Sequence, residues 1–372
     1  GEIRDLAFDA RGALGLAASA GVWRGEPRAP TARGELEHLG AATPLPVPTD
    51  APSALTTSGV AAGYTVERLS LALPGGGTLG AARELRAAPD GSLWLHDGTR
   101  AYRYAADKLE PLVAPPAPTP ARQGAPERQL PCHACLAPTG ADAGFALGLA
   151  AGAPSELTGR ARADGPLALE APAAVAASGA GEAWVVGTGL DDAWPRVLRK
   201  HAGAWSYLTG PPLGSFVAVA VHGAEAWLAG GHNATSDGTR DWPNGAGLLC
   251  HFDGRAFTTH TEPHGALLAV AAAGPGAAWA VGAAGLVLHV DGTRIERLAV
   301  PGAPWLRAVW VGGPNDVWLG GDESTLLHWD GTAWRHVDGA ALGVRVAVTS
   351  LAPGPNGGIW AAGPAGLWHV KR

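Results

Sequence analysis

A short motif recurs along this chain and constrains its fold more than any other feature. Each copy has an apolar run, a turn rich in Gly, Pro or Asn, and then a Trp followed by small residues and Gly. This pattern is typical of a β-hairpin with the Trp on its second strand. Because a single hairpin cannot bury its apolar face, the copies must pack against one another. The clearest copies lie at 174–187, 218–230, 269–282, 308–321 and 349–363.

The spacing from an apolar anchor to the aromatic residue extends the repeat into the first half of the chain. Trp184 lies nine residues after Val175, and three other clear copies keep this distance, while Val219 and Trp227 are eight residues apart. Weaker copies with a spacing of nine are Leu85–Trp94, Leu136–Phe145 with Phe in place of Trp, and Leu6–Gly15 with the aromatic residue lost. We therefore count eight hairpins.

A second hairpin follows the first in most copies. It reads as strand, Asp-Gly or Ala-Gly turn, strand, which is a strong short-range hairpin signal. The segments are 197–208, 248–260, 286–298 and 326–337. Two hairpins per copy make four antiparallel strands at roughly 40-residue spacing.

Four-stranded units of this kind bury their faces most economically as blades arranged around a ring, since closure leaves only short, protected edges. We predict an all-β chain with a single β-propeller domain over residues 1–372 and prefer eight blades. The alternative is seven, which requires that Leu6–Gly15 or Leu136–Phe145 lie outside the ring. The repeated Trp is expected to fill the wedge between neighbouring blades.

Two segments interrupt this order, and the two ends of the repeat are unequal. Residues of about 40–64 and 114–130 have the Pro-rich, polar composition of low-order insertions. The last repeat ends at Arg372 after its third strand, whereas the first offers two outer strands, 34–39 and 65–71. The termini are therefore expected to cooperate in closing the ring.

The pattern W-x-x-G … H-[WF]-D-G-x-x-W resembles exported bacterial β-propellers that share features with Kelch, Asp-box and photosystem-assembly-factor repeats. The resemblance covers nearly the whole chain. It implies a propeller architecture. Most proteins with this architecture bind or assemble partners, and a few are lyases or hydrolases. The Asp-box spacing D-x-G is replaced by D-G here, so sialidase chemistry is not implied.

Composition limits the kinds of partner and the cellular compartments that we expect for this protein. The net charge is −6 with no basic run, which argues against nucleic acid. No apolar stretch approaches the ~18 residues of a membrane span. The sequence has no Met, even at position 1, so we expect a removed signal peptide and an exported protein that is periplasmic, cell-surface or secreted. In such a compartment, a disulfide between Cys132 and Cys135 is favoured.

Departures from the repeat predict where function lies, because propellers carry it on loop insertions along one face. Two insertions fall between second and third strands, at 189–196 and 232–245, and each has an acid before a Trp-Pro pair. The corresponding loop near position 322 has two acids without an insertion. His133, His264 and Trp305 would join this face from loops between blades. The predicted partner-binding residues are Asp191, Asp192, Trp194, His232, Asn233, Asp237, Asp241, Trp242, Asp322 and Glu323.

Trp beside carboxylates suits a protein or glycan partner, since the indole supplies an apolar plate and the acids accept hydrogen bonds. The oxygens of Asn233, Asp237, Asp241 and Asn244 could instead ligate Ca²⁺, although their spacing matches no EF-hand. A solvated polar loop is the simplest alternative. No other cofactor is expected.

Two functions remain open from sequence. The preferred one is a non-catalytic platform that binds a protein or glycan and could be a subunit of an envelope complex. For this function we predict no catalytic residues. The alternative is a glycan hydrolase or lyase that uses a carboxylate pair such as Asp192 and Asp241, which would have to lie within about 5–10 Å of each other.

Overall fold

The computed structural model describes seven strands between residues 3 and 60 by their backbone, and most of residues 63–372 with side chains. Within 63–372, the residues outside the description are 75, 99, 113–134, 148–153, 159–160, 166–168, 170, 180, 189–194, 210–214, 232–245, 301–303 and 344. The chain divides into two compact units, Gly1–Gly34 and Glu35–Arg372. Each is considered by itself.

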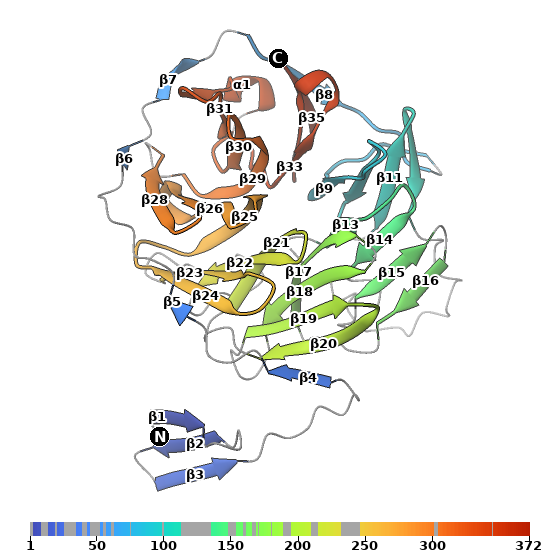
Figure 1. Cartoon of the computed structure of the whole chain (residues 1–372). Helices are drawn as coiled ribbons and strands as arrows, with labels where there is room; N and C mark the ends of the chain where they lie inside the picture. Colours follow the sequence, from blue (N-terminus) through green and yellow to red (C-terminus); the bar gives the residue numbers. More distant parts are fainter. Residues whose placement is uncertain are drawn as a thin grey trace. The chain divides into compact units, whose positions relative to one another are not determined.

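The second unit is a β-propeller of seven blades, and each blade has four antiparallel strands (Figure 1). The prediction of four-stranded propeller blades is therefore confirmed. Blades one to three are β9 (Glu84–Ala87), β10 (Leu93–His96), β11 (Ala101–Ala105), β12 (Lys108–Pro111); β13 (Leu136–Pro138), β14 (Ala143–Ala146), β15 (Ser155–Thr158), β16 (Ala161–Asp164); and β17 (Ala171–Gly179), β18 (Glu182–Thr188), β19 (Pro195–His201), β20 (Ala204–Thr209).

The remaining blades follow the same meander. Blades four to six are β21 (Ser215–His222), β22 (Glu225–Gly231), β23 (Gly247–Phe252), β24 (Phe257–Glu262); β25 (Leu267–Gly274), β26 (Ala277–Gly282), β27 (Leu286–Asp291), β28 (Arg294–Ala299); and β29 (Leu306–Gly313), β30 (Asp316–Gly321), β31 (Leu326–Trp329), β32 (Trp334–His336). Blade seven has β33 (Ser350–Pro353), β34 (Ile359–Gly363), β35 (Gly366–Lys371) and a strand from early in the chain, β8 (Thr65–Leu69). The short helices are η1 (Ala283–Gly285), α1 (Gly339–Leu342) and η2 (Pro355–Gly357).

The ring closes between blades seven and one. The first strand of each blade contacts that of the next, and β33 contacts β9. The Ser350 hydroxyl accepts a hydrogen bond from the Leu85 amide at 3.1 Å and donates one to the Leu85 carbonyl at 3.0 Å. These bonds satisfy buried backbone groups at the junction, so they stabilise the closed ring.

The early part of the second unit runs along the outer strands as a strap, defined as β4 (Glu35–His38), β5 (Thr43–Pro44), β6 (Ser53–Ala54) and β7 (Thr57–Val60). Each adds a fifth, parallel strand to one blade, from blade three to blade six in order (Figure 1). The strap leads into β8, which pairs antiparallel with β35. The expectation that the two ends close the ring together is confirmed, and 65–69 is the strand that crosses over.

Our preferred count of eight blades was wrong, and the alternative of seven is right. The Leu6–Gly15 hairpin forms, but it belongs to a separate three-stranded sheet of β1 (Ile3–Phe8), β2 (Leu14–Ala18) and β3 (Gly21–Gly25). This sheet repeats blade seven in register: Leu6 pairs with Leu16 as Leu351 pairs with Ala361. Because β33–β35 and β8 already fill the seventh place and close on blade one, this copy has no place in the ring.

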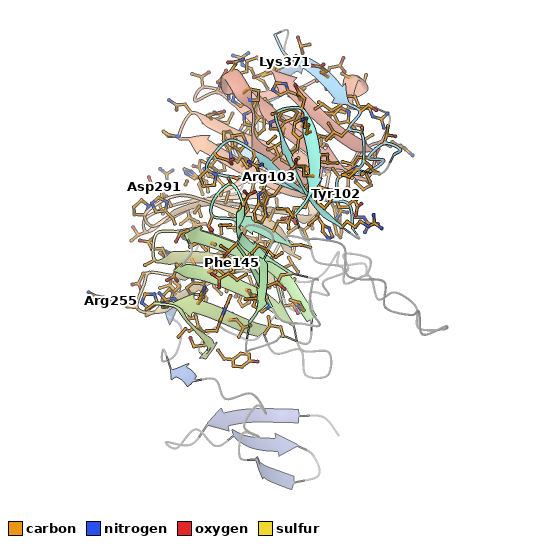
Figure 2. All side chains as sticks on the ribbon, turned by 90° about the vertical axis from the view of Figure 1, so that its right-hand side faces the viewer. Tyr102, Arg103, Phe145, Arg255, Asp291 and Lys371 are labelled. Carbon is orange, nitrogen blue, oxygen red and sulfur yellow. The ribbon has the colours of Figure 1, made fainter. Side chains whose placement is uncertain are left out.

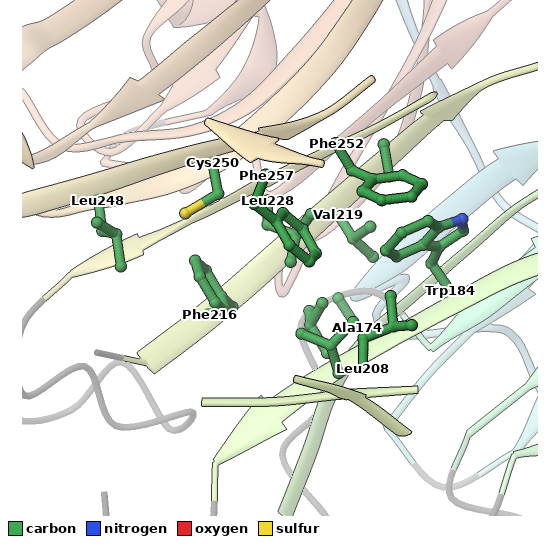
Figure 3. Packing of buried hydrophobic residues seen from close by; sticks show 13 residues of the cluster. Ala174, Trp184, Leu208, Phe216, Val219, Leu228, Leu248, Cys250, Phe252 and Phe257 are labelled. Atoms are coloured by element: carbon green, nitrogen blue, oxygen red, sulfur yellow. The ribbon is translucent and has the colours of Figure 1, made fainter. Parts of the chain in front are cut away.

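The repeated Trp residues lie between blades, as predicted. Trp184 of β18 is fully buried against Phe216, Phe252 and Phe257 of blade four (Figure 3). Trp318 of β30 is equally buried and packs with Ile359 and other residues of blade seven. Each indole therefore fills the space between its own blade and the next one.

On the third strand, a polar or charged residue faces each of these aromatic residues. Four successive blades place a His there, and its ring stacks on the Trp with centroids 4.0–4.4 Å apart. In blade three the guanidinium of Arg199 lies 5.3 Å from the ring centre of Trp184. The cross-strand pairs are Trp94–Arg103, Phe145–Glu156, Trp184–Arg199, Trp227–His251, Trp279–His289, Trp318–His328 and Trp360–His369.

Buried and half-buried histidines make the propeller sensitive to acid. Burial lowers the pKa of His289, His328, His336 and His369 below the ordinary value of 6.5. The unfolded chain therefore binds protons more readily than the native state. The contribution of the neutral histidines to the free energy of unfolding is complete above about pH 6.5, and it is lost as the pH falls through their pKa values in the folded protein. We expect the melting temperature to fall by several degrees from about pH 7.5 to about pH 5. His289→Phe retains an aromatic ring against Trp279 and should weaken the dependence of the melting temperature on pH. A wild-type melting temperature that is constant over this pH range would contradict the assignment.

Candidate functional site

One face of the propeller carries all connections between blades and all turns from second to third strands, because antiparallel strands return to the same edge. We call it the exit face. Its described parts include 263–266, 283–285, 304–305, 322–325 and 337–343. The turns from third to fourth strands lie on the opposite face. Arg255 lies in one of these turns and Asp291 directly precedes another, and both appear on one side of the propeller in Figure 2.

An aromatic–ionic cluster lies on the exit face at blade six. Trp305 precedes β29, and the guanidinium of Arg307 lies 5.5 Å from the centre of its ring. Arg307 binds Asp322 through two contacts, Nε–Oδ1 at 2.6 Å and Nη2–Oδ2 at 2.9 Å. The Asp322 amide donates to the Trp305 carbonyl at 2.9 Å. The two-pronged ion pair holds a partly exposed Trp, Arg and Asp as one rigid group.

Beside this cluster, the loop that follows β30 has an unusual backbone. Glu323 and Ser324 have φ values of 55° and 59°, the left-handed region that non-Gly residues rarely occupy. Ser324 is held there because its hydroxyl donates to the Gly343 carbonyl at 2.6 Å and accepts from the Val346 amide at 3.0 Å. Glu323 consequently points outward and forms an exposed ion pair with Arg345 at 3.2 Å. We call Trp305, Arg307, Asp322, Glu323 and Arg345 the blade-six cluster.

A second group of polar residues lies at the end of β24, the fourth strand of blade four. The carboxylate of Glu262 has no exposed surface and contacts His264 Nδ1 at 2.7 Å, the His264 amide at 3.0 Å and Arg297 Nη2 at 2.9 Å. His260 Nε2 lies 3.5 Å away. Burial alone would raise the pKa of Glu262, but the histidines and the charge of Arg297 lower it to about 2. Glu262 is therefore ionised at neutral pH and links blade four to Arg297 of blade five.

The structure locates two of the ten predicted partner-binding residues, Asp322 and Glu323, on the same loop. Asp322 is not a free carboxylate, since Arg307 binds it. The loop at 232–245 lies outside the described residues, but its flanks lie at the exit face: a Cβ on Gly231 would be 2.9 Å from the Ala246 carbonyl and 3.2 Å from the Ala266 Cβ. Also outside the described residues are Asp191, Asp192, Trp194, His232, Asn233, Asp237, Asp241 and Trp242.

Sequence reasoning missed the basic residues of this face and the buried Glu262. Arg307 and Arg345 stand alone in apolar or turn segments, so nothing local links them to Asp322 or Glu323. Glu262 did carry a signal, because His260, Glu262 and His264 alternate along an extended segment and alternate residues share a side.

Most of the residues predicted to form a disulfide or to bind a metal ion lie outside the described part of the chain. Cys132 is outside it, so the Cys132–Cys135 disulfide stays a prediction; Cys250 is a buried free thiol whose pKa is raised by burial. Asn233, Asp237, Asp241 and Asn244, the predicted calcium ligands, also lie outside it. Among the described residues, no group of three His, Cys, Asp or Glu side chains could hold a metal ion. No helix in the described part of the chain is long and apolar enough to cross a membrane.

The chain matches no protein-family model and no curated protein sequence. Solved structures resemble it in fold. YCF48 bound to D1 peptide is 16% identical over 86% of this chain and 97% of its own, with a TM-score of 0.54. Streptogramin B lyase is 13% identical over 83% and 97%, with a TM-score of 0.59. The extracellular domain of the putative hybrid two-component system BT3049 from B. thetaiotaomicron is 9% identical over 83% and 42%, with a TM-score of 0.54.

These likenesses establish the class of the protein. It is a β-propeller, as its strand order and ring closure already show. At such low identities they define the fold alone.

Proposed function

We propose that this protein is a non-catalytic binding platform that recognises a protein partner through the exit face. The observation that supports this most is the blade-six cluster, in which a Trp and two ion pairs are held by a constrained backbone on the face that carries the connections between blades. Binding surfaces favour aromatic and Arg anchors of this kind because they lose little conformational entropy on association.

The charge state of Glu262 on this face favours binding over acid–base catalysis. A general acid for glycan cleavage needs a carboxyl group with a raised pKa. On this face the pKa of Glu262 is lowered to about 2 by the histidines and Arg297 beside it, so the group stays ionised at neutral pH. The hydrolase or lyase alternative rests on Asp192 and Asp241, which lie outside the described residues.

Two neighbours in fold support a binding platform, and one of them supports a place outside the cytoplasm. One is described as bound to a peptide, and another is an extracellular domain. By analogy of fold, we propose that this chain acts after export, as part of a larger envelope complex, with a glycan partner as the alternative.

Retention of partners from native envelope extracts tests this proposal. The triple variant Trp305→Ala, Glu323→Ala, Arg345→Ala should fold normally, since Glu323 and Arg345 are largely exposed and Trp305 is partly exposed, yet retain the partner at least about tenfold less. The matched control is Arg255→Ala with Asp291→Ala on the opposite face, which should retain it fully. Equal loss with both variants, or no loss with the first, would contradict the exit face as the binding surface.

A further inference from the structure

The Glu262–His264 pair has a geometry that its role in joining blades does not require. Glu262 ends β24, and Pro263 follows it; Pro fixes its own φ and keeps the preceding residue extended. His264 therefore follows the buried carboxylate through a stiff link. Its side chain is 58% exposed, although its Nδ1 atom lies 2.7 Å from a carboxylate with no exposed surface.

Hydrogen-bond chemistry determines which ring nitrogen of His264 carries the proton. An ionised carboxylate can only accept, so the Nδ1 atom of His264 must donate to Glu262. In the neutral ring the Nε2 atom then keeps its lone pair. Because the side chain is more than half exposed while Nδ1 faces the buried carboxylate, Nε2 is the nitrogen left for a ligand.

Arg297 keeps the carboxylate in place. Its Nε and Nη2 atoms lie 3.0 and 2.9 Å from Glu262 Oε2, whereas His264 binds Oε1. The carboxylate is thus tied to blade five through one oxygen and orients the imidazole through the other. A buried carboxylate that holds a more exposed imidazole through Nδ1 is the arrangement that prepares Nε2 as an acceptor in catalytic and metal-binding histidines.

We propose that Glu262 and His264 form a carboxylate–imidazole dyad whose Nε2 atom accepts a hydrogen bond from an N–H or O–H donor of the protein partner. This inference rests on the proposed function and adds a second anchor on the same face. Glu262 acts as the positioning residue, and His264 touches the ligand. The position is close to the predicted binding loop, since Ala266, two residues after His264, lies against Gly231 where that loop begins.

The opposite face offers a matched comparison. His201 is 60% exposed, and its Nδ1 atom lies 2.7 Å from Glu182 Oε2. Glu182, however, also accepts from Trp184 Nε1 at 2.8 Å and Arg199 Nε at 2.7 Å. Glu182 begins β18 and His201 ends β19, at the turn from third to fourth strands. His201 has the same local geometry on the face that we do not expect to bind a partner.

The tautomer is tested first, without any partner. Long-range ¹H–¹⁵N correlation spectra of the full chain at about pH 8 should show His264 as a single species with the proton on Nδ1. Glu262→Gln should leave a mixture of tautomers at His264 and leave His201 unchanged. Wild-type His264 with its proton on Nε2 would overturn the dyad.

The second measurement tests the ligand role with envelope extracts. His264→Phe should reduce partner retention at least about fivefold, and His201→Phe should have no effect. If the tautomer is as expected but His264→Phe retains the partner fully, the ligand role is wrong while the platform stands. If the blade-six triple variant also retains the partner, the proposed function itself fails, so the two failures are distinguishable.

Discussion

Removing β8 is expected to lower the free energy of unfolding of the propeller by more than about 4 kcal/mol, whereas removing everything before it should leave most of that stability. β8 is the fourth strand of blade seven and pairs with β35 from Thr65–Lys371 to Leu69–Leu367. Tyr64 and Val66 pack against the cluster of blades six and seven, and Leu69 packs against that of blades seven and one. Without β8, blade seven loses both its outer ladder and this apolar cover.

Polar contacts add to this effect. The Tyr64 hydroxyl lies 2.5 Å from His328 Nδ1, and Lys371 Nζ lies 2.6 Å from Glu67. The first joins the segment entering β8 to blade six, and the second ties β8 to the last strand. Both are lost together with the strand.

Three truncations separate the contributions of the N-terminal segments. Deleting 1–34 removes only the first unit, deleting 1–62 also removes the strap, and deleting 1–70 removes β8 as well. Urea unfolding should give nearly the wild-type midpoint for the first, a modest decrease for the second and a large decrease for the third. A synthetic peptide of residues 63–71 should restore part of the stability of the shortest chain. Equal midpoints for the second and third truncations would show that β8 does not close the ring.

Trp318→Ala is expected to cost about 3–5 kcal/mol of unfolding free energy. Trp318 is fully buried between blades six and seven, and its indole nitrogen donates to Asp316 at 2.9 Å. The substitution leaves a cavity that the strands on either side cannot easily close. It also removes the ring on which His328 stacks.

Two controls show that the effect comes from packing. Trp318→Phe retains an aromatic ring but loses the hydrogen bond, so it should cost about half as much or less. Trp305→Ala removes a partly exposed Trp from the exit face and should cost less than about 1 kcal/mol. Denaturant melts give all three values, and a cost below about 1 kcal/mol for Trp318→Ala would contradict the wedge between blades.

Much of the fold could be predicted from sequence because the strands of most blades follow one another closely along the chain. Strand alternation, the Asp-Gly turns and the nine-residue spacing from Val175 to Trp184 act within a few tens of residues. The role of the Trp also follows from local pattern, because a large apolar residue repeated at one place in every blade must face the neighbouring blade.

The candidate site was less predictable. Asp322 and Glu323 could be placed on the correct face from the order of strands alone. Their partners Arg307 and Arg345 could not, because Arg307 lies across a strand pair and Arg345 lies in a separate connection. The pairing of Glu262 with Arg297 likewise needs two blades to be brought side by side.

A propeller of four-stranded blades with Trp between them follows from short-range sequence pattern and from the need to cover each blade's faces. The number of blades and the strand that closes the ring depend instead on contacts between residues far apart in the sequence. The copy at Leu6–Gly15 lacks the aromatic residue but has the same register as blade seven, so its place outside the ring is decided by the competition for one position in a closed circle. Likewise, 34–39 and 65–71 are both plausible outer strands, and pairing with β35, some 300 residues later, selects the second.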